Sequence, residues 1–249
     1  MKAYKKVAKY WDEIQKHIVD YQRQSVEMDK MFKSRGVNKT LELGCGTGIL
    51  STCLAELGYN CTGVDIDEDM LEVAREKAKN KGLNINYLKG DMRNINFNEE
   101  FDVVLCFQAM SFLETNEDFA MALSAIGNSL KPGGMFSFGV LNKEFELIEN
   151  GAPTSSFMDL VIENEDYKIV RLNSMKKIDD FEFWNAVYFI EEEGNLSMNI
   201  MKNKLRYFSA TEVKEMLGNS GFEVRNIQYK DVANMKNANM IFMTEKIRP

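Results

Sequence analysis

The chain has 249 residues, of which 45% are apolar and 28% charged, as expected for one soluble globular domain with room for a sizeable insertion. This composition excludes a disordered tail, a collagen and a small disulfide-stapled scaffold. The 31 Lys and Arg residues against 38 Asp and Glu residues give a formal charge of −7. That balance disfavours a protein built to neutralise nucleic-acid phosphates.

The cysteines and the single histidine limit which cellular compartment and which metal sites we expect. Cys45, Cys53, Cys61 and Cys106 form no C-x-x-C pair, which predicts a reduced, cytoplasmic protein without a disulfide framework. His17 is the only imidazole, so no Cys/His zinc cluster can be assembled and we expect no metal. The first residues carry no apolar signal segment, and no stretch approaches 18 apolar residues. We therefore expect neither export nor membrane insertion.

Residues 4–33 repeat apolar side chains at helical spacing, which predicts one or two amphipathic helices packed on another part of the protein. After Gly36, short β-like runs alternate with helical ones. Strands separated by helices of this kind form βαβ units, hence a parallel sheet covered on both faces. The predicted strands are 40–43, 61–65, 85–88, 101–107 and 135–141, with predicted helices through 49–57, 70–78 and 119–130.

The pattern changes after residue 142. A Glu-rich stretch predicted as helical and a loop at 151–153 lead into strand-like runs, which predict an antiparallel β meander. Ser209 and Glu212 then have the spacing of a capping box, which predicts the start of another helix. The predicted meander strands are 168–175, 181–190 and 196–208, and the strands after the helix are 222–229 and 238–244.

Alternating glycines mark the segment Leu41-Glu42-Leu43-Gly44-Cys45-Gly46-Thr47-Gly48, which leaves a predicted strand and enters a helix. Such glycines let the backbone turn tightly and approach a ligand that faces the free N–H groups of the helix start. A nicotinamide-type fingerprint, G-x-G-x-x-G/A, would need Gly or Ala where Ile49 stands. With Glu42 at the strand end, the G-x-G-x-G segment instead resembles motif I of the class I S-adenosylmethionine-dependent methyltransferases.

Two further acidic residues fit this resemblance. Asp65 ends the second predicted strand, where a carboxylate can accept hydrogen bonds from both ribose hydroxyls of a cofactor. Asp91, within Gly90-Asp91-Met92, matches the family position that accepts from the adenine amino group. Each acid also has a purely structural interpretation. Asp65 could be a helix N-cap, although Asp67 fits that role better, and Asp91 could be an ordinary exposed acid in a loop.

The resemblance extends over residues 37–141 and 209–246. Residues 101–113 resemble motif IV with its following loop, which in the family lines the methionine moiety and the methyl acceptor. The resemblance implies an α/β fold with a Rossmann-like, doubly wound, mostly parallel seven-stranded sheet whose last strand is antiparallel. The implied parts are an N-terminal helical lid (1–35), a cofactor-binding domain (36–141 and 209–249) and an inserted substrate-side β meander (142–208).

The cofactor implied by the resemblance is S-adenosyl-L-methionine, which leaves as S-adenosyl-L-homocysteine. Methyl transfer from a sulfonium is an in-line displacement, in which alignment supplies roughly 7–11 kcal/mol of barrier reduction and makes a general base optional. The expected cofactor-binding residues are Glu42, Gly44, Cys45, Gly46, Gly48, Asp65, Ile66, Met70, Asp91, Met92 and Phe107.

Candidate acceptor contacts lie in the N-terminal helix, the loop after residue 107 and the meander. An aromatic face favours a cationic sulfonium or amine, although aromatic residues at helical spacing more often pack in a core and a lone helical His is more often on the surface. The candidate catalytic residues are Tyr10 and His17, and the candidate substrate contacts are Tyr10, Trp11, Gln108, Phe112 and Tyr188. Alternation places Trp184 and Tyr188 on the opposite strand face from Phe183 and Phe189, and either face can meet the pocket.

The prediction is therefore a methyltransferase that methylates a nitrogen or oxygen of a small molecule, as a monomer or homodimer without nucleic-acid or membrane partners. An RNA or protein methyltransferase is a rival hypothesis, because residues 1–35 hold nine basic against five acidic residues. The tetrapeptide Phe107-Gln108-Ala109-Met110 is unlike the N/D-P-P-Y/F of nucleic-acid amino methyltransferases. Two hypotheses from different classes also stay open: an NAD-dependent oxidoreductase, opposed by Ile49, and a non-catalytic cofactor-binding protein.

Overall fold

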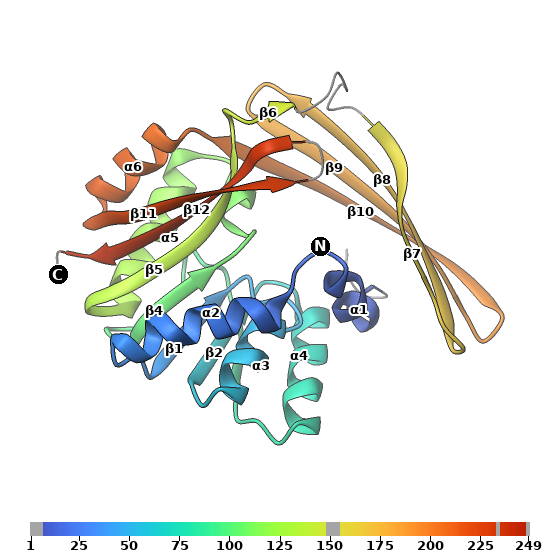
Figure 1. Cartoon of the computed structure of the whole chain (residues 1–249), viewed down its shortest axis with the longest axis horizontal. Helices are drawn as coiled ribbons and strands as arrows, with labels where there is room; N and C mark the ends of the chain where they lie inside the picture. The colour runs from blue at the N-terminus through green and yellow to red at the C-terminus, as the bar shows by residue number, and fades with distance from the viewer. Residues whose placement is uncertain (1–6, 148–154, 233–234, 248–249) are drawn as a thin grey trace.

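A computed structural model describes residues 7–147, 155–232 and 235–247 of the chain. Its centre is a twisted sheet in which seven strands follow the order β3-β2-β1-β4-β5-β12-β11 (Figure 1). The strands are β1 Lys39–Leu43, β2 Asn60–Asp65, β3 Asn86–Lys89, β4 Phe101–Cys106, β5 Leu130–Asn142, β11 Phe222–Val232 and β12 Met235–Lys246.

The pairing within this sheet confirms the predicted fold. Strands β1 to β5 pair in parallel, whereas β12 runs antiparallel to both β5 and β11. The sheet is therefore mostly parallel with its last strand antiparallel. None of the helices in the described residues is both long and apolar enough to cross a membrane.

Helices cover both faces of the sheet, as strand alternation requires. On β4, Val103 and Leu105 pack with the α2 and α3 side chains, whereas Val104 and Cys106 pack with α5. Both faces of this central strand are buried from Val103 to Cys106, which explains the apolar sequence of that part. The helices are α2 Tyr21–Ser34, α3 Ile49–Glu56 and α4 Glu68–Asn80 on one face, and α5 Asn116–Ser129 and α6 Ala210–Asn219 on the other.

Four antiparallel strands form the meander that extends from the edge of this fold (Figure 1). They are β7 Ser155–Glu163, β8 Tyr167–Ile178, β9 Phe181–Glu192 and β10 Asn195–Phe208. The meander joins the α/β core where Tyr207 and Phe208 pair in parallel with Leu141 and Asn142 at the end of β5. The strand β7 was missing from the sequence prediction.

The stretch after residue 142 differs from the prediction of a helix. Its described part contains the short strand β6, Glu146–Leu147, which pairs with Met235 and Lys236 of β12. Pairing with an exposed strand edge outweighs the helical preference of a Glu-rich segment. The rest of the predicted helix and the loop at 151–153 lie outside the described residues.

The first described residues pack against one face of the meander. The segment comprises the 3-10 turn η1, Ala8–Tyr10, and the short helix α1, Trp11–Lys16. Val7, Tyr10 and Ile14 share a buried cluster with Ile169 and Tyr188 of the meander. We call this the inner face of the meander, and it is the face of β9 that carries Trp184 and Tyr188. The N-terminal segment is thereby held by apolar contacts to β8 and β9.

Helix α6 provides a test of the capping-box prediction. The Ser209 hydroxyl accepts from the Glu212 backbone N–H at 3.1 Å, whereas the Glu212 side chain pairs with Arg206 instead of returning to Ser209. We expect Ser209→Ala to lower the free energy of unfolding by about 1 kcal/mol, measured by chemical denaturation. Ser209→Asp keeps an acceptor and should stay close to wild type; equal losses in both variants would contradict the capping role.

Candidate active site

The glycine-rich loop connects β1 to α3 at the carboxyl edge of the sheet. Gly44, Gly46 and Gly48 all adopt left-handed backbone conformations, with φ of 65°, 54° and 69°. Residues other than glycine rarely adopt this backbone conformation, which accounts for the alternating glycines.

The three glycines differ in what surrounds them. A Cβ atom on Gly44 would lie 2.4 Å from the Ala109 Cβ, and one on Gly48 would lie 2.1 Å from the Tyr87 hydroxyl. A Cβ on Gly46 would meet only the Trp11 Nε1, at 3.9 Å. Two of the glycines are therefore required by contacts within the protein, and Gly46 is the one that faces open space beneath Trp11.

Glu42 lies behind this loop, at the end of β1. One carboxylate oxygen accepts from the Ser51 backbone N–H at 2.9 Å in the first turn of α3. Burial raises the pKa of Glu42 to about 7, because removal from water disfavours the charged form more than the Ser51 hydrogen bonds favour it. Cys45, whose side chain is buried in the loop, has a thiol pKa raised by the same burial.

Asp65 ends β2 and holds the glycine-rich loop in place. Its Oδ2 accepts from the Gly46 N–H at 2.7 Å, and its Oδ1 accepts from the Asp67 N–H at 2.9 Å. Burial nevertheless raises the pKa of Asp65 above its ordinary value. Asp67, as the sequence indicated, is the N-cap of α4 and accepts from the Met70 N–H.

Asp91 follows β3, and the neighbouring Gly90 N–H donates to the Asp65 carbonyl at 2.9 Å. The Asp91 carboxylate takes both the Nε and a terminal nitrogen of Arg93, which also pairs with Asp118 at 2.6 Å. The Arg93 hydrogen bonds hold the pKa of Asp91 below its ordinary range. No sequence pattern indicated this internal ion pair.

The remaining predicted cofactor residues have contrasting environments. Ile66, next to Asp65, is 61% exposed, an unusual state for an isoleucine beside a buried strand. Met92 and Phe107 are half-buried and pack on opposite cores of the sheet. Met70 is buried in the first turn of α4. The structure thus brings Glu42, the glycine-rich loop, Asp65, Ile66 and Asp91 together along the ends of β1, β2 and β3.

The loop after β4 contains two predicted acceptor contacts, Gln108 and Phe112. Gln108 adopts φ of 67°, a strained state for a residue with a side chain, and both residues are exposed. The 3-10 turn η2, Met110–Phe112, follows, and the Leu141 N–H donates to the Ser111 hydroxyl at 2.9 Å. The loop is therefore attached to the end of β5.

The N-terminal segment lies over the glycine-rich loop. The Thr47 hydroxyl donates to Asp12 at 2.6 Å, and Lys77 of α4 pairs with Asp12 and donates to the Thr47 carbonyl at 2.8 Å. Sequence reasoning missed Asp12, although it adjoins the predicted contact Trp11. These contacts place α1 across the loop that carries the cofactor motif.

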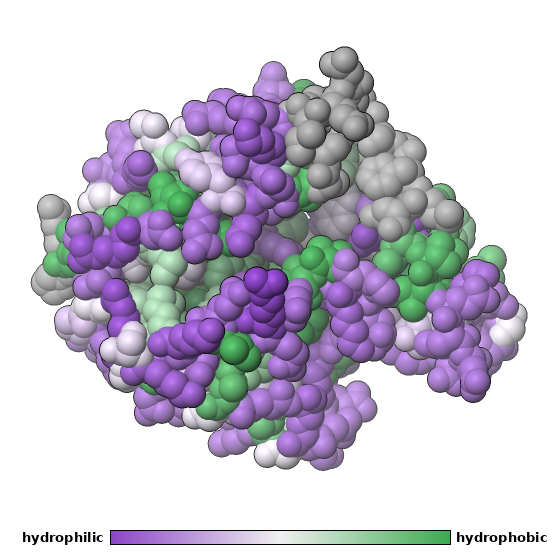
Figure 2. Space-filling view, in the orientation of Figure 1, coloured by the Kyte–Doolittle hydropathy of each residue, from purple (hydrophilic) through white to green (hydrophobic). Residues whose placement is uncertain are grey.

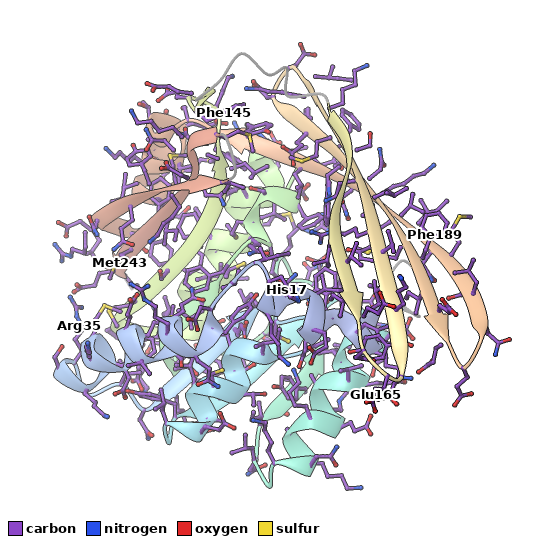
Figure 3. The ribbon with its side chains drawn as sticks, turned by 45° about the vertical axis from the view of Figure 1, so that its right-hand side comes forward. His17, Arg35, Phe145, Glu165, Phe189 and Met243 are labelled. Carbon is purple, nitrogen blue, oxygen red and sulfur yellow. The ribbon has the colours of Figure 1, made fainter. Side chains whose placement is uncertain are left out.

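The other predicted N-terminal and meander residues are not equally accessible. Tyr10 and Tyr188 are buried in the cluster between the N-terminal segment and the meander, where Tyr10 packs edge-on against Tyr167 with ring centroids 4.8 Å apart. His17, labelled in Figure 3, is exposed at the end of α1. The roles of these residues stay predictions. Figure 2 shows the surface hollowed between the α/β core and the meander.

Known proteins share both the sequence motifs and the fold. A family model described as a methyltransferase domain matches residues 40–134. The putative methyltransferase YqeM of Bacillus subtilis is 30% identical over 233 residues, covering 90% of this chain and 88% of that protein.

Two solved structures have the same fold over nearly the whole chain. An S-adenosylmethionine-dependent methyltransferase from Clostridium acetobutylicum has a TM-score of 0.80 at 20% identity, covering 97% of this chain and 98% of that one. CalS10, an amino pentose methyltransferase from Micromonospora echinaspora bound to S-adenosylmethionine, has a TM-score of 0.74 at 18% identity, covering 95% and 96%.

The chain belongs to the class I S-adenosylmethionine-dependent methyltransferases. It is an enzyme whose cofactor is S-adenosylmethionine, as the glycine spacing and the acids at the strand ends predicted. The nicotinamide oxidoreductase and the non-catalytic binding protein are not favoured by these relatives.

Two costs of placing a side chain at Gly44 can be measured separately: the contact with Ala109 and the left-handed backbone conformation. Gly36 has nearly the same φ, 66°, but nothing within 4 Å of an added Cβ. Gly36→Ala should cost about 1–2 kcal/mol from conformation alone, whereas Gly44→Ala should cost a further ~1–3 kcal/mol through overpacking. Denaturation of both variants measures this. Adding Ala109→Gly to Gly44→Ala should recover the extra loss, and no recovery would disprove the contact.

The pKa of Glu42 predicts a pH-dependent stability. Between the unfolded pKa of about 4.3 and the folded pKa of about 7, the folded chain binds a proton that the unfolded chain has lost. Wild-type stability should therefore fall as pH rises through this window, by up to about 4 kcal/mol. Glu42→Gln should lack that fall and be the more stable protein at pH 8. A stability difference that does not change with pH would contradict the burial of the carboxyl.

Proposed function

We propose that the enzyme methylates a nitrogen or oxygen of a small-molecule acceptor, bound between the glycine-rich loop, the loop after β4 and the meander. The observation that carries this proposal is the position of α1 across the glycine-rich loop, anchored by Asp12 to Thr47 and packed against the meander. Such a cover leaves space for a small acceptor and encloses the donor, which helps to exclude water.

The residues at the strand ends fit S-adenosylmethionine chemically. Asp65 uses two of its lone pairs on backbone N–H groups, so that others can accept from ribose hydroxyls. The exposed Ile66 offers an apolar surface for the adenine ring, with Met92 and Asp91 on the next loop. Ionised Glu42 complements the positive charge of the methionine end. Gly46 leaves room for the ligand, because an added Cβ would point into the space under Trp11.

The bound cofactor supplies an electrophilic methyl group, and the residues of the chain supply alignment. In-line transfer needs the acceptor atom held near the methyl carbon and opposite the sulfur, which the loop after β4 and the N-terminal segment are placed to do. Trp11 can present its aromatic face to the sulfonium. In this proposal η1 and α1, within the predicted lid of residues 1–35, cover the cofactor, whereas α2 packs on the sheet. Residues 142–208 contribute the substrate side.

A small acceptor is supported by the relatives and by the charge of the surface. CalS10, which has the same fold, is described as acting on an amino pentose. Within residues 1–35, the RNA or protein hypothesis rested on an excess of basic residues. Five of those nine form ion pairs, namely Lys9, Lys16, Arg23, Lys33 and Arg35, the last of which is labelled in Figure 3. Two of these pairs, to Glu192 and Glu245, bring acids from outside the segment and so reduce its excess of positive charge. We retain a cytoplasmic monomer or homodimer as the expected state.

The ribose assignment can be tested with a pair of neighbouring acids. Asp65→Ala should weaken S-adenosylmethionine binding by about 1.5–3 kcal/mol, because hydroxyls lose a charged acceptor. Asp67→Ala removes only the N-cap of α4 and should lower stability while leaving affinity nearly unchanged. Calorimetric titration with S-adenosylmethionine, S-adenosylhomocysteine and NAD measures this. Affinity within twofold of wild type for Asp65→Ala would show that the ribose lies elsewhere.

A further inference from the structure

The inner face of the meander changes character along its length. Near the hairpin tips it carries the apolar cluster packed under the N-terminal segment, with Arg171 and Asn199 on either side of Tyr188. Toward the junction with β5 it is polar. The strand register places Trp184 between Met175 and Asn203, and Glu182 between Lys177 and Leu205. We define the inner polar patch as Asn173, Glu182, Trp184, Asn203 and Tyr207.

Asn203 is the residue of this patch that most needs a partner. Its side chain is only 8% exposed, and its amide nitrogen has no hydrogen-bond partner in the described structure. An unsatisfied buried amide costs about 1–3 kcal/mol, and native proteins retain such groups rarely and for a reason. A ligand with a hydrogen-bonding oxygen would remove this cost.

The other patch residues are held in position by one another. The Trp184 indole donates to the Asn173 amide oxygen at 3.0 Å. The Tyr207 hydroxyl donates to one carboxylate oxygen of Glu182, and the second oxygen has no partner among the described residues. Glu182 and Tyr207 are both buried, at 6% and 3% exposure. The patch thus holds one carboxylate oxygen and one amide nitrogen that have no partner among the described residues, beside an indole fixed by its hydrogen bond.

The patch lies next to the loop proposed to contact the acceptor. Tyr207 pairs with Leu141 at the end of β5, and the Leu141 N–H donates to Ser111 in η2. Cys106 at the end of β4 pairs with Phe138 of β5. Leu141, the partner of Tyr207, is three residues further along β5, and the Tyr207–Leu141 pair therefore lies about 10 Å beyond the end of β4. This is the carboxyl edge of the sheet, where ligands bind in open α/β folds.

We propose that the inner polar patch binds the methyl acceptor, and that the acceptor is a hydroxylated aliphatic molecule and not a planar phenol. Asn203 contacts an oxygen of the acceptor, Glu182 accepts from one of its hydroxyl or amino groups, and the Trp184 ring packs on its carbon skeleton. The Glu182 carboxylate accepts hydrogen bonds and the Asn203 amide nitrogen donates them. Hydroxyl groups, which both donate and accept, can pair with either. This proposal rests on the small-molecule function proposed above and names its substrate class.

The test measures S-adenosylhomocysteine release by the full chain with two probe sets and yeast tRNA. The hydroxylated set is D-glucosamine, serinol and myo-inositol, and the phenolic set is catechol and 4-hydroxybenzoate. We expect turnover of a hydroxylated probe, with KM raised about 2- to 12-fold in Asn203→Ala and kcat within twofold of wild type. Asn185→Ala, on the outer face of β9, is the matched control and should leave KM unchanged.

A second measurement keeps the proposal independent of turnover. The chain has two tryptophans, so Trp11→Phe leaves Trp184 as the reporter of the patch. Its fluorescence should respond to a hydroxylated probe with S-adenosylhomocysteine present, and additional Asn203→Leu should abolish the response while raising the unfolding midpoint. A stability gain without any change in KM or fluorescence would show that Asn203 binds only water.

The outcomes separate the two proposals. Turnover of phenols alone, or an unchanged KM in Asn203→Ala, would overturn the patch while leaving a small-molecule function. Turnover of tRNA alone would overturn the proposed function, and with it the patch. Absence of a Trp184 response to every hydroxylated probe would overturn the patch even if no probe is methylated.

Discussion

The contact on which the site depends is the one between Asp65 and the backbone of Gly46, at 2.7 Å. A charged acceptor on a backbone N–H is among the stronger hydrogen bonds in a protein, and this one joins the end of β2 to the loop after β1. The loop needs such support because three of its residues lie in a left-handed conformation. The acid assigned to ribose therefore also shapes the loop beneath the rest of the cofactor.

The second constraint is the way the N-terminal segment joins two parts of the fold. Asp12 attaches it to the glycine-rich loop through Thr47 and Lys77, while Val7, Tyr10 and Ile14 bury it against the meander. Movement of α1 away from the glycine-rich loop would expose apolar surface and break the partly buried Asp12–Lys77 ion pair. Opening of the site therefore requires the loss of both contacts. Among the described residues, the end of β10 is the part of the meander that pairs with the α/β core, and the ion pairs Lys204–Glu114 and Lys143–Asp180 add to that attachment.

The apolar cluster and the inner polar patch occupy different parts of the inner face of the meander. Tyr188 belongs to the apolar cluster under the N-terminal segment, whereas Asn203 and the Glu182–Tyr207 pair lie closer to the loop after β4. The candidate contacts picked by residue type alone, Tyr10 and Tyr188, are core residues in this structure. Aromatic side chains fill cores more often than they line sites, because each buries a large apolar area.

Local sequence patterns were enough to predict the α/β plan, the glycine-rich loop and the acids at the strand ends, because strand periodicity, left-handed glycines and capping residues are local properties. The strand β6, the missed strand β7, the anchoring of Asp12 and the face of β9 that turns inward emerged only from the folded chain. These features depend on pairing and packing between segments far apart in the chain, which no local pattern records. The same holds for Asn203, whose amide matters only because its neighbours leave it without a partner.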